Sequence, residues 1–528
     1  MTSTLRARTM AAARVIGALA LASVPLAAVP APASATNYTD VSGSGSSWAA
    51  VAIDQWAQDV RPNNIVVNYN PDGSATGRND YMQNQDDFTG SDPPFRNGHD
   101  ELGGTGSERP AQGYSYVPDV AGGTAFMYHL TVAGNLITNL RLSGQTLMKI
   151  FTGQITNWAD AAITHDYGAQ LPSLPITPVI RSDGSGATYF LTRWMEHVFP
   201  SDWDAFCQRV HPGIAQPCPQ TEFYPSNFGS AKAENGSNNV ATYIASTYGN
   251  GSIGYDEYAY ALNYHYPVVK MLNPGGYYVL PSASNVAVAL TRAVINLDQS
   301  SPDFLQQNLD SVYTFTDPRS YPLSSYSYFI VPRSGTKLPA NFSSAKGATL
   351  STWLNFDLCQ GQRQVIQLGY SPLPINLVRG GLQQLNQIPG HVATTPESSL
   401  AGCNNPTFVN GQDVLLNTAP QPSPCDKAGA PLNCVVKNGK PTATGKGANP
   451  KATTGATPGP SGNASPAAGG PAPAATSTGP VTAVTVNLAS ADRSSQIALA
   501  TITTASIIAA VAIPPALAAW LRRRGQND

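Results

Sequence analysis

Three short turns rich in glycine and serine, each directly before a segment with helical periodicity, constrain the fold of this chain more than any other feature. They read "SGSGSSW" at 42–48, "DGSATG" at 72–77 and "DGSG" at 183–186. Apolar segments typical of buried strands precede the second and third turns, at 64–69 and 176–182. This repeated order predicts an α/β fold with mostly parallel sheets, whose ligands bind where strands end and helices begin.

Apolar residues recur at helical spacing after the first and third turns, and a proline follows each run. The two predicted helix faces are Ala49, Ile53, Trp56 and Val60 before Pro62, and Phe190, Leu191, Trp194, Met195 and Val198 before Pro200. Further strands are predicted at 122–132, 251–261 and 326–332, and a short helix within 142–158. The folded part, residues 36–434, is long enough for two domains.

Both ends of the chain predict export and attachment to a membrane. Arginines, an apolar run and the small residues "APASA" predict a signal peptide over 1–35. Residues 435–495 are rich in Pro, Ala, Gly, Thr and Ser and predict a linker. Residues 496–521 predict a transmembrane helix, and the arginines of the tail, 522–528, predict that this tail is cytoplasmic. The folded part is then expected on the extracellular face of the cell membrane, held by a single C-terminal anchor; a tail that is cleaved after sorting is the alternative.

The composition excludes several classes of function. The formal net charge is −2 and charged residues make up 12% of the chain, so no broad basic surface for nucleic acid is predicted. The cysteines form no Cys-x-x-Cys pair and the histidines no His-x-x-x-His motif, so neither a metal nor another cofactor is expected. Six cysteines in an exported chain favour disulfides, and proximity alone suggests Cys207 with Cys218, Cys359 with Cys403, and Cys425 with Cys434.

The turns also have the chemistry of an anion site. The first N–H groups of a helix lack intrahelical partners and carry a partial positive charge, glycine allows close backbone approach, and serine adds a hydroxyl. Arg181, just before the third turn, adds a guanidinium that matches two oxygens of a phosphate or a carboxylate. Each turn alone is more typical of a simple helix cap, and Arg181 alone is as typical of an ordinary ion pair. Together they predict a site for a small tetrahedral oxyanion.

An ordered set of motifs resembles one known family. The motifs are "GSGSSW", "YNPDGSATG", "DDFTGSDPPF", "LSGQTLMKIFTGQITNWAD", "RSDGSGATYF" and "GSIGYDEYAYA". In this order they resemble the PstS family of phosphate-binding proteins of phosphate ABC transporters, strongly over 42–261 and weakly beyond. The resemblance implies a two-lobed periplasmic-binding-protein fold of type II with a hinge. Lobe 1 would comprise 36–120 and 270–434, and lobe 2 would comprise 121–269.

The same resemblance implies which residues bind phosphate. It makes Asp92 an acceptor carboxylate and Asp183 the partner of Arg181. The full set that it implies is Ser47, Trp48, Ser74, Asp92, Arg181, Asp183, Ser185, Gly186 and Ala187. Ala187 departs from the family, which has a threonine there, so one hydroxyl contact is missing while the backbone N–H and the adjacent Thr188 remain.

Asp92 indicates which anion is bound. A carboxylate repels an anion unless the anion brings a proton to share, and phosphate near neutral pH carries at least one proton whereas sulfate carries none. The predicted function is therefore capture of inorganic phosphate for uptake through a phosphate ABC permease; the alternative is a phosphate-binding surface sensor, scavenger or adhesin. Catalysis is not predicted, because "SDGSGA" lacks the glycine that a hydrolase nucleophile turn has two places before its serine.

Overall fold

The computed structural model describes residues 38–444, except for 97, 99, 101, 104, 105, 297, 299, 300, 302–305, 404, 410 and 411. The predicted signal peptide and transmembrane span lie outside these residues, as does the predicted linker from 445 onward. Among the residues described, no helix combines the length and the apolar character needed to cross a membrane.

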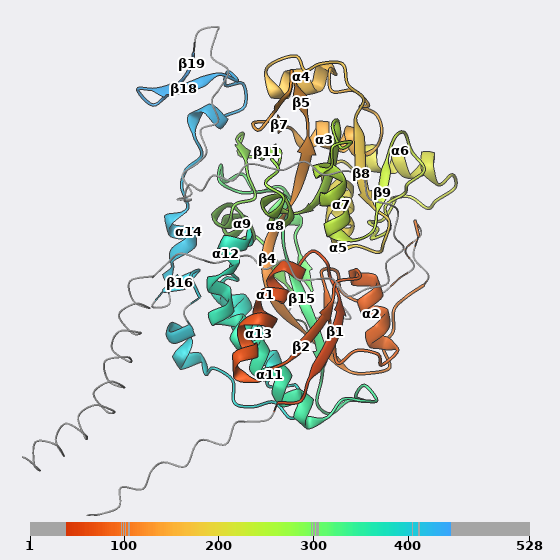
Figure 1. Ribbon diagram of the computed structural model, residues 1–528, viewed down its shortest axis with the longest axis vertical. Coiled ribbons are helices and arrows are strands. Elements are labelled where there is room, and N and C mark those ends of the chain that lie inside the picture. Colours follow the sequence, from red (N-terminus) through yellow and green to blue (C-terminus); the bar gives the residue numbers. More distant parts are fainter. Residues whose placement is uncertain are drawn as a thin grey trace, which may run out of the picture. The chain divides into compact units, whose positions relative to one another are not determined.

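A curled sheet with strand order β2-β1-β3-β15-β4-β10-β8-β9 divides the fold into two lobes (Figure 1). The strands are β1 (Val41–Gly45), β2 (Val67–Asn70), β3 (Phe88–Ser91), β4 (Tyr114–His129), β8 (Thr177–Arg181), β9 (Lys232–Glu234), β10 (Ser252–Glu257) and β15 (Ser324–Pro332). The long strand β4 pairs with β15 as far as Gly123 and with β10 from Thr124 onward, so it belongs to both halves of the sheet. We call β2, β1, β3 and β15 with the helices on them lobe 1, and β10, β8 and β9 with their helices lobe 2.

The sheet is mixed, whereas the sequence predicted mostly parallel strands. β1 is parallel to β2 and β3, and β8 is parallel to β9 and β10. β15 is antiparallel to β3 and β4, and β4 is antiparallel to β10. β15 lies between β3 and β4 and is antiparallel to both, so the change of strand direction occurs at the centre of the sheet, at β15 and β4. The strand-turn-helix units are therefore parallel, and the two central strands are not.

Helices cover both halves of the sheet (Figure 1). Those of lobe 1 are red, orange or teal, and those of lobe 2 are amber to green. In lobe 1 they are α1 (Ala50–Val60), α2 (Ser74–Met82), α11 (Ser344–Leu358) and α13 (Ile375–Leu385). In lobe 2 they are α3 (Gly144–Phe151), α4 (Ala161–Tyr167), α5 (Gly186–Val198), α6 (Pro200–Val210) and α7 (Gly236–Ala245). Shorter helices are α8 (Tyr258–Asn263), α9 (Ala283–Leu290), α10 (Asp310–Tyr313), α12 (Val365–Leu368) and α14 (Val414–Thr418).

The predicted helices after the first and third turns are confirmed as α1 and α5. Both end where the prolines required, at Val60 and Val198. Their predicted faces are buried, with Trp56 and Leu191 fully enclosed, except that Val198 is only half-buried. Two predictions are wrong in detail. The second turn already enters α2 at Ser74, and the strand predicted at 251–261 ends at Glu257, where α8 begins.

Short strands outside the main sheet form four pairs and one three-stranded sheet among the described residues. They are β5 (Thr131–Val132) with β6 (Asn135–Leu136), β7 (Arg141–Leu142) with β11 (Lys270–Leu272) and β12 (Tyr278–Val279), β13 (Val294–Ile295) with β14 (Gln307–Asn308), β16 (Phe408–Val409) with β17 (Gln412–Asp413), and β18 (Cys434–Lys437) with β19 (Lys440–Ala443). Residues 435–443, at the start of the predicted linker, thus form nearly all of the β18-β19 hairpin.

All three disulfides suggested by proximity are present. Cys359–Cys403 attaches the C-terminal segment to the end of α11, and Cys425–Cys434 closes a loop beside the β12-β11-β7 sheet. Arg141 donates to the carbonyl of Ala430 at 2.6 Å, and Lys270 forms an ion pair with Asp426 at 2.6 Å. The segment after α13 is therefore fixed at both of its ends.

Candidate anion-binding site

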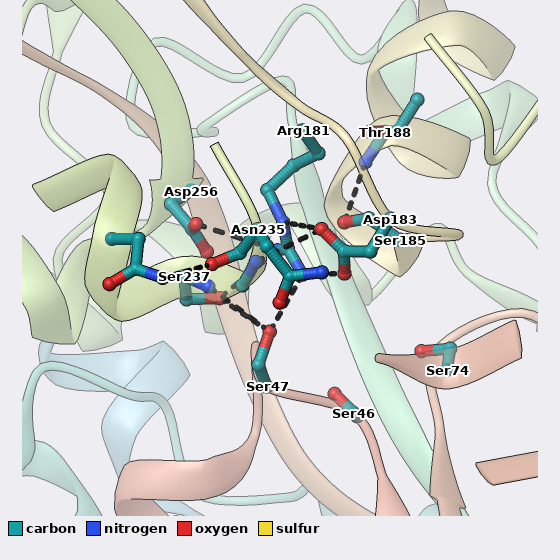
Figure 2. Close-up of polar contacts among 12 residues, drawn as sticks. Ser46, Ser47, Ser74, Arg181, Asp183, Ser185, Thr188, Asn235, Ser237 and Asp256 are labelled. Atoms are coloured by element: carbon teal, nitrogen blue, oxygen red, sulfur yellow. Dashed lines mark hydrogen bonds and ion pairs between the residues drawn. The ribbon is translucent and has the colours of Figure 1, made fainter. Parts of the chain in front are cut away.

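Five strand ends from the two lobes converge on one place. α1, α2, α5 and α7 begin there, after β1, β2, β8 and β9, and β3 ends there at Ser91, directly before Asp92. Within each lobe the carboxyl ends of the parallel strands share an edge, so each lobe brings helix N-termini, whose first N–H groups lack intrahelical partners, to its side of the site. Figure 2 shows Ser46, Ser47 and Ser74 of lobe 1 opposite Arg181 and Ser237 of lobe 2.

Arg181 lies at the centre of this arrangement and is 2% exposed. Its Nε donates to Asp183 Oδ1 at 2.8 Å, and its Nη2 donates to Asp183 Oδ2 and to Ser47 Oγ, the latter at 2.9 Å. Its Nη1 donates to Ser237 Oγ at 3.1 Å and lies 3.6 Å from Asp256 Oδ2. One guanidinium thus joins residues of both lobes, and two of its contacts are to neutral hydroxyls.

Asp183 holds the guanidinium in place. Burial opposes ionisation of Asp183, but the charge and hydrogen bonds of Arg181 outweigh burial and hold the pKa of Asp183 below its ordinary value. The carboxylate also accepts the N–H of Gly236, the first residue of α7, at 3.0 Å. Asp183 is therefore a charged support for both Arg181 and the turn before α7.

Asp92 is the other predicted charged residue of the site, and it is 1% exposed. It accepts hydrogen bonds from Ser46 Oγ at 2.7 Å and Ser74 Oγ at 3.2 Å. Burial raises the pKa of Asp92 above its ordinary value, although the neighbouring hydroxyls and Arg181 oppose this shift. The two serines thus fix the position of the Asp92 carboxyl, and burial favours a proton shared between this carboxyl and a ligand.

Two glycines allow the lobes to meet at the site. Gly186 begins α5, and a Cβ on it would lie 1.9 Å from Asp92 Oδ2. Gly73, before α2, has φ +108°, and a Cβ on it would lie 2.7 Å from Asp183 Oδ2. Any larger residue at Gly186 would displace Asp92, and at Gly73 the positive φ also favours glycine.

The remaining predicted residues also lie at the site. Ser185 Oγ accepts the N–H of Thr188 at 3.4 Å and so caps α5. Ala187 lies in the first turn of α5 and is fully buried. The hydroxyl of Thr188 pairs with the Tyr255 hydroxyl at 2.8 Å, so Thr188 does not replace the missing hydroxyl of Ala187.

Trp48 has a packing role in this structure. Its ring contacts Phe190 of lobe 2 and Tyr370, with ring centroids 6.3 and 5.8 Å apart. The Tyr370 hydroxyl donates to the carbonyl of Trp48 at 2.6 Å, and that of Tyr260 donates to the carbonyl of Ser47 at 2.5 Å. These contacts fix the turn before α1, which leaves its N–H groups facing the site.

Sequence reasoning missed Ser46, Ser237 and Asp256. Ser237 had a local signal, because "ENGSNN" is another small-residue turn between a strand and a helix. Ser237 Oγ lies 2.8 Å from Ser47 Oγ, which makes it a link between the lobes. Asp256 had no local signal, since its proximity to Arg181 depends on the pairing of β8 with β10.

Comparisons with known proteins agree with this geometry. A family model described as the PBP superfamily domain matches residues 30–360, and the chain belongs to that superfamily. The chain is 32% identical over 354 residues to the phosphate-binding protein PstS of Xylella fastidiosa (strain 9a5c), which covers 66% of this chain and 86% of the relative. It is therefore a member of the PstS family of phosphate-binding proteins, which confirms the resemblance of the motifs.

Other relatives are more distant. The phosphate-binding protein PstS of Methanocaldococcus jannaschii is 24% identical over 351 residues, which is 65% of this chain and 85% of the relative. A solved structure of a phosphate-binding protein from Stenotrophomonas maltophilia aligns with a TM-score of 0.45 and 19% identity over 71% of this chain and 98% of that chain. The two PstS relatives are named as phosphate-binding proteins, in agreement with the expectation that this chain is not an enzyme.

Proposed function

We propose that the protein captures inorganic phosphate between its two lobes on the extracellular side of the cell membrane and presents it to a phosphate ABC permease. The observation that carries this proposal is that Asp92 of lobe 1 and Arg181 of lobe 2 bond neighbouring serine hydroxyls, those of Ser46 and Ser47, where helices of both lobes begin. The relatives named as phosphate-binding proteins support the same ligand.

In this proposal the ligand oxygens are held by charge, hydroxyls and backbone N–H groups. Arg181 supplies the fixed positive charge, and Asp183 keeps its fork oriented. Ser47, Ser74 and Ser185 offer hydroxyls, and the first N–H groups of α1 and α5 point to the same place. Gly186 and Ala187 contribute only their backbone N–H groups.

Asp92 provides the selectivity. Its carboxylate can accept the proton of a phosphate oxygen, and the raised pKa of Asp92 makes that shared proton favourable. Sulfate brings no proton, so Asp92 must first take one from solvent, at a free-energy cost that grows as the pH rises. Discrimination against sulfate is thus expected to be strongest at neutral and higher pH.

Contacts between the lobes couple binding to lobe closure. Arg181 of lobe 2 reaches Ser47 of lobe 1, and the N–H of Ala75 in α2 donates to the carbonyl of Gly184 at 3.2 Å. A bound oxyanion would add further bonds to both sides. Release of the phosphate to a permease then requires the two lobes to separate. A site between two lobes therefore suits uptake, because opening the lobes frees the ligand.

Calorimetric titration of the full-length protein in detergent, freed of bound anion by unfolding and refolding, tests the proposal. We expect one-to-one binding of phosphate and far weaker binding of sulfate. Absence of phosphate binding by the refolded protein would contradict the proposed site. Loss of phosphate uptake in cells that lack only this protein tests the transport role, and unchanged uptake would favour a surface sensor, scavenger or adhesin.

A further inference from the structure

Arg181 has a second carboxylate neighbour beside Asp183. The parallel register of β8 and β10 pairs Gly254 with Val179, and two residues further along each strand it brings Asp256 opposite Arg181. Asp256 Oδ2 lies 3.6 Å from Nη1 of the arginine and has no hydrogen-bond partner among the described residues, whereas Oδ1 accepts the N–H of Glu257 at 2.8 Å. The backbone N–H of Glu257 fixes Oδ1 of Asp256, whereas Oδ2 interacts with the guanidinium by charge alone.

This position differs from that of Asp183 in a way that matters for a ligand. Asp183 accepts hydrogen bonds from two nitrogens of the guanidinium, Nε and Nη2. Asp256 lies on the Nη1 side, next to the hydroxyl of Ser237, which in turn reaches Ser47 at the site. Its negative charge therefore stands close to any anion that binds Arg181, and Asp256 is 4% exposed, so little solvent screens it.

The two charged groups of the ion pair beside Asp256, Arg181 and Asp183, keep a constant charge in the range where Asp256 titrates. Burial raises its own pKa to about 6, although Arg181 opposes the shift. Arg181 stays positive, and Asp183, whose pKa is lowered, stays negative. Burial raises the pKa values of the remaining neighbours, Glu257, Tyr260 and Tyr370, and so disfavours their ionised forms.

We infer that Asp256 competes with the bound anion for Arg181 and weakens phosphate binding when it is ionised, so that affinity depends on the acidity of the surroundings. This inference rests on the proposed function. In the ionised form, the carboxylate repels the phosphate oxygens and neutralises part of the guanidinium charge. In the neutral form, it does neither, and Arg181 is fully available to the ligand.

Linkage fixes the sign and the size of the effect. A bound anion disfavours the ionised carboxyl, so it raises the pKa of Asp256 further above about 6. A rise of about one unit means that affinity falls about tenfold as the pH increases through that range. Phosphate and Asp92 titrate too, so the effect must be measured relative to a variant that retains both.

The test is Asp256→Asn in the full-length protein, titrated with inorganic phosphate between about pH 5 and pH 8. The amide keeps the oxygen that accepts the Glu257 N–H, so folding is expected to be retained, and thermal unfolding checks this. We expect equal affinities of variant and wild type at about pH 5, and about tenfold tighter binding by the variant at about pH 8. Dividing the two dissociation constants at each pH cancels the titration of phosphate and of Asp92.

Asp86→Asn is the matched control. Burial also raises the pKa of Asp86 to about 6, but its carboxylate accepts from Ser44 and makes no ion pair with Arg181. This variant should follow the wild type at every pH. A ratio for Asp256→Asn that does not change with pH, or that changes equally for Asp86→Asn, would overturn the inference while the proposed function stands. Failure of wild type and variant alike to bind phosphate would remove the proposed function and this inference with it.

Discussion

Among the residues that the structure describes, Arg78 and Arg181 are almost completely buried and both join the lobes, but they are surrounded differently. Arg78, in α2, pairs with Glu108 at 2.7 Å and with Glu222 of lobe 2 at 2.6 Å. Its Nη1 donates to Ser91 at 2.9 Å. Arg181 instead binds one carboxylate through two nitrogens and leaves its other contacts to serine hydroxyls and to the more distant Asp256.

This difference indicates which arginine is available to a ligand. Ionised carboxylates only accept hydrogen bonds, so the partners of Arg78 cannot exchange their roles. Arg96, which lies 3.2 Å from Glu108, supplies a second positive charge for the two glutamates. Hydroxyls can rotate and can either donate or accept, so Ser47 and Ser237 can release Arg181 to an incoming anion and bind that anion themselves. A buried arginine is therefore available to an anion only where its partners, such as serine hydroxyls, can release it.

Arg78→Met should give the largest effect, on stability. It leaves Glu108 and Glu222 buried without their main cation, which costs about 3–5 kcal/mol for a broken buried pair. Denaturant unfolding monitored by circular dichroism measures the loss. Adding Glu222→Gln removes one of the stranded charges and should restore part of the stability. An Arg78→Met protein as stable as the wild type would show that the cluster is not the fixed interlobe connection described here.

Arg181→Ala should affect binding more than folding. We expect phosphate affinity to fall by at least about tenfold, because a charge-assisted hydrogen bond to an anion is worth about 1.5–3 kcal/mol. Titration calorimetry measures the change. Arg193→Ala is the matched control, since Arg193 lies on α5 but pairs with Asp310 at 3.3 Å, away from the site. Equal affinities of wild type and Arg181→Ala would place Arg181 in the same class as Arg78.

The sequence was sufficient for features that are local in the chain. The small-residue turns predicted the starts of α1 and α5, and "RSDGSGATYF" placed Arg181, Asp183 and Ser185 together because they are neighbours along the chain. The directions of β4 and β15 were not predictable in this way, because they follow from pairings between distant segments.

The same distinction explains which site residues were missed. Ser237 follows a turn of the kind already recognised, and the same rule applied once more would have found it. Asp256 lies in "YDEYAY", which has the alternation of an ordinary strand, and its role depends on the register of β10 against β8. The Arg78 cluster joins α2 to residues 108 and 222, and no local motif announces it.

Asp92→Asn should reduce the preference for phosphate over sulfate by about tenfold, because the amide can donate to either anion. In the wild type, sulfate binding should strengthen as the pH falls, since protonation of Asp92, whose pKa is raised by burial, supplies the proton that sulfate lacks. In the variant the part of that pH dependence that comes from Asp92 should disappear, which leaves only the part that comes from Asp256. Competition titrations of the two anions at several pH values measure both effects, and unchanged selectivity would exclude Asp92 as the discriminating group.

Ala187→Thr should give the smallest effect, a gain of about three- to fivefold in phosphate affinity, because it adds one neutral hydroxyl at the first turn of α5. Ala187 is fully buried, so the added volume is itself a perturbation. Ala187→Val has nearly the same shape without the hydroxyl and isolates this cost. Tighter binding by the threonine variant than by the valine variant would show that a further hydroxyl near Arg181 can bind the ligand. This is expected if the hydroxyls around Arg181 can turn from the arginine to the anion. Equal binding would mean that the hydroxyl at 187 does not reach the ligand, and that backbone N–H groups alone serve this end of the site.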